Sequence, residues 1–404
     1  MTAPDASLPT TGAPRIVIVS ASVAAGHDRA ALALADRLTA RGFAVDRHDF
    51  LDLMPQHTGT VLCGGYRKII TRIPSLYQWM YERSERTAGC GPVQTAVLRA
   101  TERRMLAVIP PDAVAVLATY PLAARVLGRL RLTGRLQLPV ATYLTDFSVH
   151  PLWIAPGVDL HLAHHELTAA QARGHGVGRV EATGPVVDPR FQPTTADRRT
   201  RARAAFGLPA HGPIALLVAG SWGVGPIGKA AVDVAATGTA TPVVVCGQNT
   251  ALAARLRKAG IEHVFGWVDD MPALMHASDV MVQNAGGFSS LEALASGLPV
   301  ATYRSLQGHG RTNAAVLDAA GLAVWIREPE SLAATLTDLI HGPLGRRQRA
   351  AGLALVAAGQ SGAEEAVADL AKAVFPQAPD DNAETPSTAK IRIPAQATTD
   401  PILV

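Results

Sequence analysis

A histidine that closes a loop of small residues is the first candidate for acid–base chemistry. The loop begins at Ser20 and ends at His27, and the residues from Asp28 to Arg41 have the pattern of a helix. Histidine titrates near neutral pH and can act as a general base. A histidine at a helix start can also lack any catalytic partner, and this loop alone leaves both interpretations open. Its glycine pattern is not the G-x-G-x-x-G of a dinucleotide fold, which argues against NAD.

A second set of chemically capable side chains follows the strand-like segment 140–144. Asp146 comes just after this segment, and His150 and Trp153 follow in a loop that is interrupted by proline. An aspartate at the carboxyl end of a strand, with a histidine and an aromatic residue close behind it, is typical of a ligand site. The alternative is an aspartate that only caps a turn.

The loop after segment 214–219 is rich in glycine. It contains Gly220, Ser221 and Gly223. Such a loop can free backbone N–H groups for an anion, or it can simply make a tight turn, and the pattern alone favours neither.

A second glycine-containing loop leads directly into a helix. Gly286 and Gly287 precede a helical segment that begins near Ser289. Amide donors and the positive end of the helix dipole at such a place favour a phosphate. Glu292 lies in the first turn, where its carboxylate can accept hydrogen bonds from a ribose diol or can serve only as a helix-capping acid.

The elements that must position these loops alternate along the chain. Short β-branched segments are separated by Ala- and Leu-rich helical segments, which is the pattern of a parallel, doubly wound α/β sheet. The predicted strands are Arg15–Ser20, Phe43–Phe50, Ala113–Ala118, Val140–Leu144, His161–Ala163, Ile214–Ala219, Pro242–Cys246, His263–Phe265, Val280–Gln283, Pro299–Thr302 and Ala323–Ile326.

The strands fall into two α/β halves of similar size. A Pro-, Arg- and Ala-rich stretch separates them and predicts a hinge followed by one helix. The predicted organisation is a disordered N-terminus (1–14), a first Rossmann-like domain (15–190), a second one (191–345), C-terminal helices (346–375) and a disordered tail (376–404).

The composition places the chain among reduced cytoplasmic proteins. It has 404 residues, of which 48% are hydrophobic and 17% charged, enough for a sizeable core. No apolar run reaches the roughly 18–20 residues that a bilayer-spanning helix needs, and the N-terminus lacks the pattern of a secretory signal. Cys63, Cys90 and Cys246 are scattered, with neither metal-type spacing nor a disulfide framework.

Basic residues gather between positions 67 and 135, beginning with Arg67 and Lys68, although the net charge is only +4. Such a run is either a solvated face or a surface for anionic lipid, and nucleic acid is the weaker partner. The stretch 66–86 mixes these bases with Trp79 and aliphatic residues and is broken near Pro74. This spacing predicts an interfacial helix on a membrane surface, with a core-facing helix as the alternative.

Five segments, taken together, resemble the GT-B glycolipid glycosyltransferases. This group includes monogalactosyldiacylglycerol synthase and processive diacylglycerol glucosyltransferase and, more distantly, the lipid II-forming N-acetylglucosaminyltransferase. The resemblance spans about residues 15–345. Its segments are IVIVSASVAAGHDRAA, TDFSVHPLWIAPGVDLHLAHHE, VVVCGQNTALAARL, FGWVDDMPALMHASDV and NAGGFSSLEALASGLPV, the last followed by Asn313.

The resemblance implies two Rossmann-like parallel-sheet domains that face a central cleft, the GT-B fold. It implies an inverting enzyme that moves a hexose from a UDP-sugar to a membrane lipid such as diacylglycerol. His27 is then the expected base, with Asp146 as a second candidate or as the partner of an imidazolium, and His150 and Trp153 lie on the acceptor side. No Asp-x-Asp pair follows a strand, so we expect neither a catalytic metal nor another cofactor.

The same resemblance assigns the donor side. Gly220, Ser221 and Gly223 are expected to face the diphosphate, with Gly286, Gly287 and Ser289 on the phosphates and Glu292 on the ribose. The remaining donor-side residues are Gly26, Cys246, Gly247, Asn249, Val268 and Met271 (the last two beside the uracil), His309 and Asn313.

Two segments depart from the family pattern. The first loop reads Ala24-Ala25-Gly26-His27 where the family usually has G-x-G-H. The family's P-G-Q-E-x-x-N is here Gln307 to Asn313, with His309 and Gly310 in place of the pair that contacts sugar hydroxyls. The identity of the sugar and the class of acceptor therefore stay open.

Three other functions are compatible with this sequence. A transferase with the same fold can act on a polyprenyl-linked sugar or a secondary metabolite. A hydrolysing UDP-sugar 2-epimerase needs carboxylates near the sugar ring, and the sequence shows no clear set of them. A non-catalytic UDP-sugar-binding protein is the third alternative.

Overall fold

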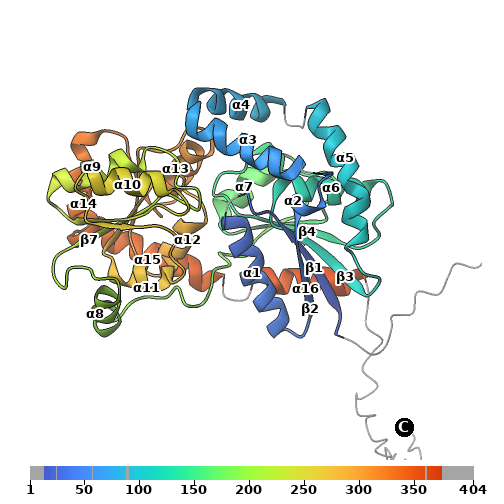
Figure 1. Cartoon of the computed structure of the whole chain (residues 1–404). Helices are drawn as coiled ribbons and strands as arrows, with labels where there is room; N and C mark the ends of the chain where they lie inside the picture. The colour runs from blue at the N-terminus through green and yellow to red at the C-terminus, as the bar shows by residue number, and fades with distance from the viewer. Residues whose placement is uncertain (1–12, 24, 57, 88–90, 360–361, 375–404) are drawn as a thin grey trace, which may run out of the picture.

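The computed structural model describes residues 13–23, 25–56, 58–87, 91–359 and 362–374. The two ends that are predicted to be disordered lie outside the described residues, apart from positions 13 and 14, and so does Cys90. Two α/β halves stand side by side (Figure 1), each built on one sheet.

The sheet of the first half has six strands, all parallel, in the order β2-β1-β3-β4-β5-β6. Its strands are β1 (Arg15–Ser20), β2 (Ala44–Asp49), β3 (Ala113–Ala118), β4 (Val140–Leu144), β5 (Leu160–Ala163) and β6 (Val180–Ala182). Every residue of β3 and β4 is buried, as expected for central strands with helices on both faces.

The sheet of the second half also has six parallel strands, in the order β12-β11-β10-β7-β8-β9. Its strands are β7 (Ile214–Val218), β8 (Thr241–Val245), β9 (His263–Phe265), β10 (Val280–Gln283), β11 (Val300–Tyr303) and β12 (Val324–Ile326). Two parallel sheets with interleaved helices confirm the predicted fold class.

Helices cover both faces of each sheet. In the first half they are α1 (Ala25–Ala40), α2 (Phe50–Leu53), α3 (Thr58–Arg72), α4 (Pro74–Thr87), α5 (Pro92–Ala107), α6 (Pro121–Leu132), the 3-10 turn η1 (Pro151–Trp153) and α7 (Glu166–Gly174). The second half carries α8 (Ala196–Ala205), α9 (Ile227–Thr237), α10 (Thr250–Lys258), α11 (Met271–Ala277), α12 (Phe288–Ala295), α13 (His309–Ala319), η2 (Pro329–Ser331), α14 (Leu332–His341) and α15 (Pro343–Ala358), and the chain ends its described part with α16 (Ala363–Val374). Among the described helices none is both long and apolar enough to cross a bilayer.

The chain passes between the halves twice, and the two crossings touch. A Cβ on Gly184 would lie 2.2 Å from Cα of Gly359, so only glycine fits at the point where the two connecting segments touch. After the second crossing, α16 packs on α1 and β3 of the first half, where it is drawn in red (Figure 1). Arg37 on α1 and Glu364 on α16 form an ion pair at 3.5 Å. The last helix therefore closes the first half rather than extending the second.

Each sheet changes its strand order at one central place. In the first sheet β1 lies between β2 and β3, and in the second sheet β7 lies between β10 and β8. Ligands of open parallel sheets bind beyond the carboxyl ends of the strands at such switch points. We therefore expect a ligand to bind at the loops after β1 and β3 and at the loops after β7 and β10.

Candidate active site

His27 lies in the first turn of α1, directly after the loop that follows β1. Its Nδ1 lies 2.7 Å from the carbonyl oxygen of Thr119 and 3.1 Å from Oγ1 of Thr145. Thr119 follows β3 and Thr145 follows β4, so three neighbouring strand ends hold this ring. The rings of Tyr120 and Trp153 lie 5.2 Å and 6.0 Å from it, centroid to centroid.

These contacts decide which nitrogen of His27 carries the proton. A carbonyl oxygen can only accept, so the Nδ1 that bonds to Thr119 must be the protonated nitrogen. Burial lowers the pKa of His27, and the nearby Asp146 carboxylate and the Thr119 carbonyl oppose that shift only in part. The neutral ring therefore has a free lone pair on Nε2, as a general base requires.

Asp146 connects the two halves of the molecule. One carboxylate oxygen accepts a hydrogen bond from Nδ2 of Asn313, on α13, at 3.4 Å, and the other accepts one from the indole N–H of Trp153 at 3.4 Å. Asn313 is fully buried, and its Oδ1 accepts hydrogen bonds from the backbone N–H and the hydroxyl of Ser148 at 2.8 Å and 2.9 Å. The loop after β4 is thus bonded to α13 of the second half directly beside His27.

His150 and Trp153 support this loop from within. Nδ1 of His150 accepts a hydrogen bond from Leu152 N at 3.0 Å, and its Nε2 lies 3.0 Å from Oγ of Ser84. Burial lowers the pKa of His150 to about 4, so the ring is neutral at pH 7. Trp153 is only 2% exposed, so it does not reach a membrane-facing surface, and its indole N–H binds Asp146 instead.

The glycine loops after β7 and β8 pack backbone against backbone. Gly220 and Gly223 have φ of 66° and 58°, in the left-handed region that favours glycine. A Cβ on Gly223 would lie 2.3 Å from the carbonyl oxygen of Cys246, and a Cβ on Gly247 would lie 2.4 Å from that of Ser221. The close approach of the two loops therefore requires Gly223 and Gly247, whereas a Cβ on Gly220 would meet nothing within 4 Å and only its φ favours glycine.

The other residues predicted on this side of the second sheet also have contacts within the protein. Asn249 caps α10 by accepting from Leu252 N, and its Nδ2 donates to the carbonyl of Gly223 at 2.8 Å. The side chain of Cys246 is buried in the core, and burial raises the pKa of its thiol to about 11. Met271 is buried as well, whereas Val268 is half-buried against the same core.

The start of α12 faces the first half of the molecule. A Cβ on Gly26 would lie 3.0 Å from Cβ of Phe288, so α1 and α12 meet at their N-terminal turns. Gly286 has φ of 67° and would carry a Cβ 2.6 Å from Cβ of Asn313, whereas a Cβ on Gly287 would meet nothing within 4 Å. Open space therefore adjoins Gly287 at the positive end of a helix, where an anion is favoured. The N–H groups on either side are already used: that of Gly286 donates to Oε1 of Gln283 and that of Ser290 to the Gly287 carbonyl.

Glu292 already has a partner. It is only 1% exposed, and Nη1 of Arg29, on α1, donates to its two carboxylate oxygens at 2.9 Å and 2.8 Å. Burial raises the pKa of Glu292, and the Arg29 charge opposes that shift. The two oxygens of an ionised carboxylate offer about four acceptor positions, so the two bonds from Arg29 do not exhaust its capacity to accept.

The segment that departs from the family pattern is folded against α4. His309, in the first turn of α13, has Nδ1 2.7 Å from the hydroxyl of Tyr77. A Cβ on Gly310 would lie 2.8 Å from the carbonyl oxygen of Asn284, so this backbone has no space for the longer side chain of the family pattern. His309 is therefore the residue of this pair that can reach a ligand.

The helices α3 and α4 form the predicted surface region, and Pro74 begins the second of them as the sequence indicated. They lie along one side of the molecule, above the space between the halves (Figure 1). Trp79 is 53% exposed, Lys68 is exposed and Arg67 is half-buried, with its guanidinium 6.0 Å from the centre of the Trp222 ring. Most of the side chains of these two helices are exposed or half-buried, but Ile70 and Tyr77 are buried in a small hydrophobic cluster with Leu306. One face of the pair is therefore open and the other is packed.

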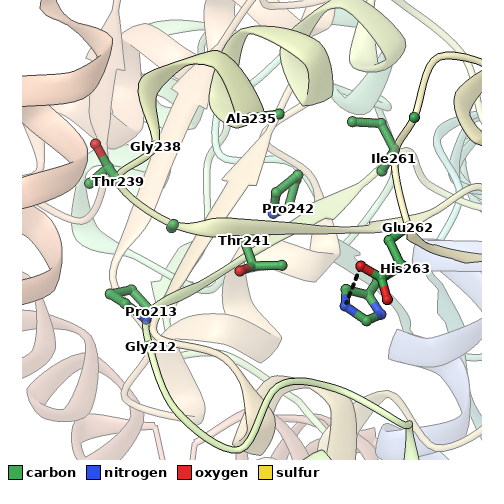
Figure 2. Close-up of a pocket in the computed structure, with 12 residues that line it drawn as sticks. Gly212, Pro213, Ala235, Gly238, Thr239, Thr241, Pro242, Ile261, Glu262 and His263 are labelled. Carbon is green, nitrogen blue, oxygen red and sulfur yellow. Dashed lines mark ion pairs between the residues drawn. The ribbon is translucent and has the colours of Figure 1, made fainter.

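A separate cavity of about 350 Å³ lies at the opposite edge of the second sheet. Figure 2 shows Pro213, Thr241 and His263 around it, and these residues stand before or at the starts of β7, β8 and β9. The glycine loops follow the other ends of the same strands. This cavity is therefore remote from the candidate active site.

Sequence reasoning missed the residues that hold His27 and Glu292. Arg29 sits two positions after His27 on α1, yet its partner is 263 positions away. Thr119 acts through a backbone carbonyl, which no side-chain pattern reveals. Tyr77 and Tyr81 lie in the stretch 66–86, for which the sequence predicts an interfacial helix or a core-facing one but no contact with the segment around His309. The aromatic spacing of that stretch is the available signal.

Comparisons with known proteins agree with this geometry. A family model described as monogalactosyldiacylglycerol (MGDG) synthase matches residues 27–187, and one described as glycosyl transferases group 1 matches residues 226–342. A processive diacylglycerol beta-glucosyltransferase of Bacillus pumilus is 23% identical over 341 residues, which cover 81% of this chain and 87% of that protein. The Bacillus subtilis protein of the same name is 26% identical over 233 residues, 56% of this chain and 60% of its own length.

Solved structures agree on the architecture. Medicago truncatula UGT71G1 complexed with UDP-glucose has a TM-score of 0.58 at 12% identity, over 90% of this chain and 98% of that one. The chain is a GT-B glycosyltransferase. MurG of Acinetobacter baumannii also has this fold, with a TM-score of 0.51 at 16% identity over 89% of this chain and 99% of that one.

The two family matches fall on the two halves of the glycosyltransferase. The first match begins at His27 and contains Asp146 and His150, whereas the second begins at residue 226, after the loop of Gly220 and Gly223, and contains Gly286, Gly287, Glu292 and His309. The side chains able to perform acid–base chemistry and the loops able to hold a phosphate therefore come from different halves.

Proposed function

We propose that this glycosyltransferase moves a hexose from a UDP-sugar to a membrane lipid of the diacylglycerol class, with inversion at the anomeric carbon. The observation that carries the proposal is His27. It has a free Nε2 lone pair, and the turn of α1 that holds it packs on the start of α12, where open space adjoins Gly287. The names of the relatives support the substrates, since they describe diacylglycerol as acceptor and UDP-glucose as a bound ligand.

In the proposed reaction, Nε2 of His27 removes the proton of the acceptor hydroxyl. The hydroxyl oxygen forms a bond to the anomeric carbon from one face, and the bond from that carbon to the UDP oxygen breaks on the other face. The electron pair leaves with the β-phosphate of UDP, and the product is a glycoside plus UDP. Asp146 lies close enough to favour the imidazolium that forms.

The donor half would stabilise the leaving group. The N–H groups of the loops that contain Gly220 and Gly287, together with the dipole of α12, would face the diphosphate. Glu292 would accept hydrogen bonds from the ribose, and Ser289 lies beside it. These groups can supply the charge stabilisation themselves, so we propose that turnover needs no divalent metal and expect it to persist in EDTA.

The surface of α3 and α4 would bring the enzyme to its acceptor. Leu76, Trp79 and Met80 are 36%, 53% and 40% exposed, and Lys68 and Arg72 are exposed on the same pair of helices. An amphipathic surface with aromatic and basic side chains binds anionic bilayers through both apolar burial and charge. We therefore propose a peripheral enzyme of the cytoplasmic membrane surface.

UDP release from a panel of UDP-hexoses, with and without vesicles that contain diacylglycerol, tests the proposed function. We expect one hexose to give release that depends on diacylglycerol. Release that is independent of diacylglycerol would indicate hydrolysis. Binding of a UDP-sugar without release would move the acceptor to the polyprenyl-linked or secondary-metabolite class, or would make this chain a UDP-sugar-binding protein.

A further inference from the structure

Helix α4 has two faces with different environments. Trp79 and Met80 on one face are exposed, whereas Tyr77 on the other is only 5% exposed. The hydroxyl of Tyr77 lies 3.3 Å from that of Tyr66 on α3, and the Tyr77 ring also contacts that of Tyr81 at 6.2 Å between centroids. The exposed face is the proposed lipid-binding surface, and the buried face looks toward the second half of the molecule.

The buried face of α4 holds the segment that leads into α13. Besides the bond from Tyr77 to His309, the Oε1 of Gln78 accepts from the backbone N–H of Gly308 at 2.6 Å. The hydroxyl of Tyr81 lies 3.1 Å from Oγ1 of Thr312.

Gly308 has φ of 65°, and a Cβ on it would lie 2.8 Å from the Tyr77 ring and 3.0 Å from the Tyr81 ring. The backbone of the segment thus passes closely over two aromatic rings. Residues 308–312 follow the carboxyl end of β11, on the same edge of the sheet as the glycine loops.

Tyr77 determines how the His309 ring is presented. Burial lowers the pKa of His309 and raises that of Tyr77 well above its usual range, so both groups are neutral at pH 7. A neutral imidazole that uses Nδ1 for the phenol keeps Nε2 for another partner. Within the described part of the chain, no residue bonds to that Nε2.

We propose that Tyr77 is a positioning residue that connects the lipid-binding face of α4 to the donor sugar through His309. The inference rests on the proposed function and deepens it. The phenol orients His309 toward a hydroxyl of the hexose, and docking of α4 on a bilayer stabilises the contacts that α4 makes with residues 308–312. A membrane surface thereby strengthens binding of the sugar part of the donor, while the nucleotide part is held elsewhere.

The matched variants Tyr77→Phe and Tyr66→Phe test this connection. Each removes one phenol hydroxyl, and the two hydroxyls are neighbours, but only Tyr77 bonds to His309. The dissociation constants of UDP and of the UDP-hexose that supports turnover are measured by calorimetry for the full chain. The titrations are made with and without vesicles of phosphatidylglycerol and phosphatidylcholine.

In Tyr77→Phe we expect about three- to tenfold weaker binding of the UDP-hexose, the scale of one hydrogen bond. Binding of UDP should be unchanged, and Tyr66→Phe should match the wild type. Vesicles should tighten the binding of the UDP-hexose to the wild type and to Tyr66→Phe, but not to Tyr77→Phe. In a double-mutant cycle, Tyr77→Phe should add little once His309 is replaced by Ala, because both changes interrupt the same path.

Several outcomes would overturn the inference. Unchanged binding of the UDP-hexose to Tyr77→Phe would show that Tyr77 does not position His309 for the sugar. Equal weakening of UDP and UDP-hexose binding would also contradict the inference, because it would indicate a general loss of structure. Additive effects in the cycle would also contradict it. A wild type that binds UDP in no condition would instead contradict the proposed function, so the two failures are distinguishable.

Discussion

The two halves of the molecule supply different kinds of groups to the candidate active site. In the first half, the loops after β3 and β4 place the backbone carbonyl of Thr119 and the hydroxyl of Thr145 against Nδ1 of His27. In the second half, open space adjoins Gly220 and Gly287, whereas Cys246 is buried and Asn249 makes hydrogen bonds within the structure. We therefore expect the chemical step to depend on side chains of the first half and phosphate binding to depend on the backbone conformation of the second.

The largest effect is expected at His27. In His27→Ala, turnover should fall by roughly 10²–10⁴, the scale of general base catalysis, because Nε2 no longer takes the acceptor proton. Steady-state UDP release in the presence of lipid measures it. The affinity for UDP should be retained, since the nucleotide is held by the other half, and the exposed His211→Ala provides a matched control. Near-normal turnover would remove His27 from the mechanism.

The next largest effect is expected at Glu292, the one buried carboxylate proposed to bind the nucleotide. Glu292→Gln should weaken UDP binding by about 10- to 100-fold, because charge-assisted hydrogen bonds to the ribose are lost. Calorimetry with UDP measures this change.

The variant Arg29→Ala distinguishes a role of Glu292 in UDP binding from its role in the ion pair with Arg29. It should lower Tm by leaving a buried charge unpaired, yet it should preserve more UDP affinity than Glu292→Gln does. If Glu292→Gln binds UDP like the wild type, then Glu292 serves only to hold α1 against α12.

Alanine substitutions at the adjacent Gly286 and Gly287 should distinguish a glycine needed for the backbone conformation from one beside space for a ligand. Gly286→Ala should cost at least about 1–2 kcal/mol of stability, since its φ is 67° and its Cβ would meet Asn313. Gly287→Ala should leave Tm nearly unchanged but raise KM for the UDP-sugar, because the new methyl group enters the open space beside the helix. Thermal unfolding and donor titrations compare the two variants; equal loss of stability in both would contradict the assignment of that space.

The smallest effect is a shift of the pH profile. Burial lowers the pKa of His27, so its Nε2 lone pair stays free as the pH falls through 6.5 and is lost only below that value. The acid limb of kcat/KM should therefore lie below pH 6.5. Because of this shift, His27 binds a proton more tightly in the unfolded chain than in the folded one. Protonation therefore favours unfolding, and the contribution of His27 to the free energy of unfolding declines as the pH falls below 6.5. An acid limb centred above 6.5 would show that His27 is not the titrating base.

The sequence predicted the sheets well because their central strands are buried on both faces. Arg15–Ser20, Ala113–Ala118 and Val140–Leu144 coincide with β1, β3 and β4, where continuous apolar runs leave little choice of element. The edge strand β6 was missed because it has only three residues and no buried position. The helix break before Pro74 was predicted correctly, because proline disfavours the helical region for the residue before it.

The candidate site was less accessible to sequence reasoning. The glycine motifs correctly predicted the positions of loops. The roles of His27, Asp146 and Glu292 stay predictions until they are tested. The ion pair of Glu292 with Arg29 and the bond of His309 with Tyr77 join residues more than 230 positions apart. Such contacts follow from the docking of two domains, which no local pattern records.

Mass analysis of extracted lipid tests the central claim most directly. The full chain is incubated with vesicles that contain diacylglycerol and with each UDP-hexose in turn, beside His27→Ala. We expect diacylglycerol that is heavier by one or more hexose residues with the wild type, and very little of it with His27→Ala. Release of UDP with free hexose and unmodified lipid would contradict the account.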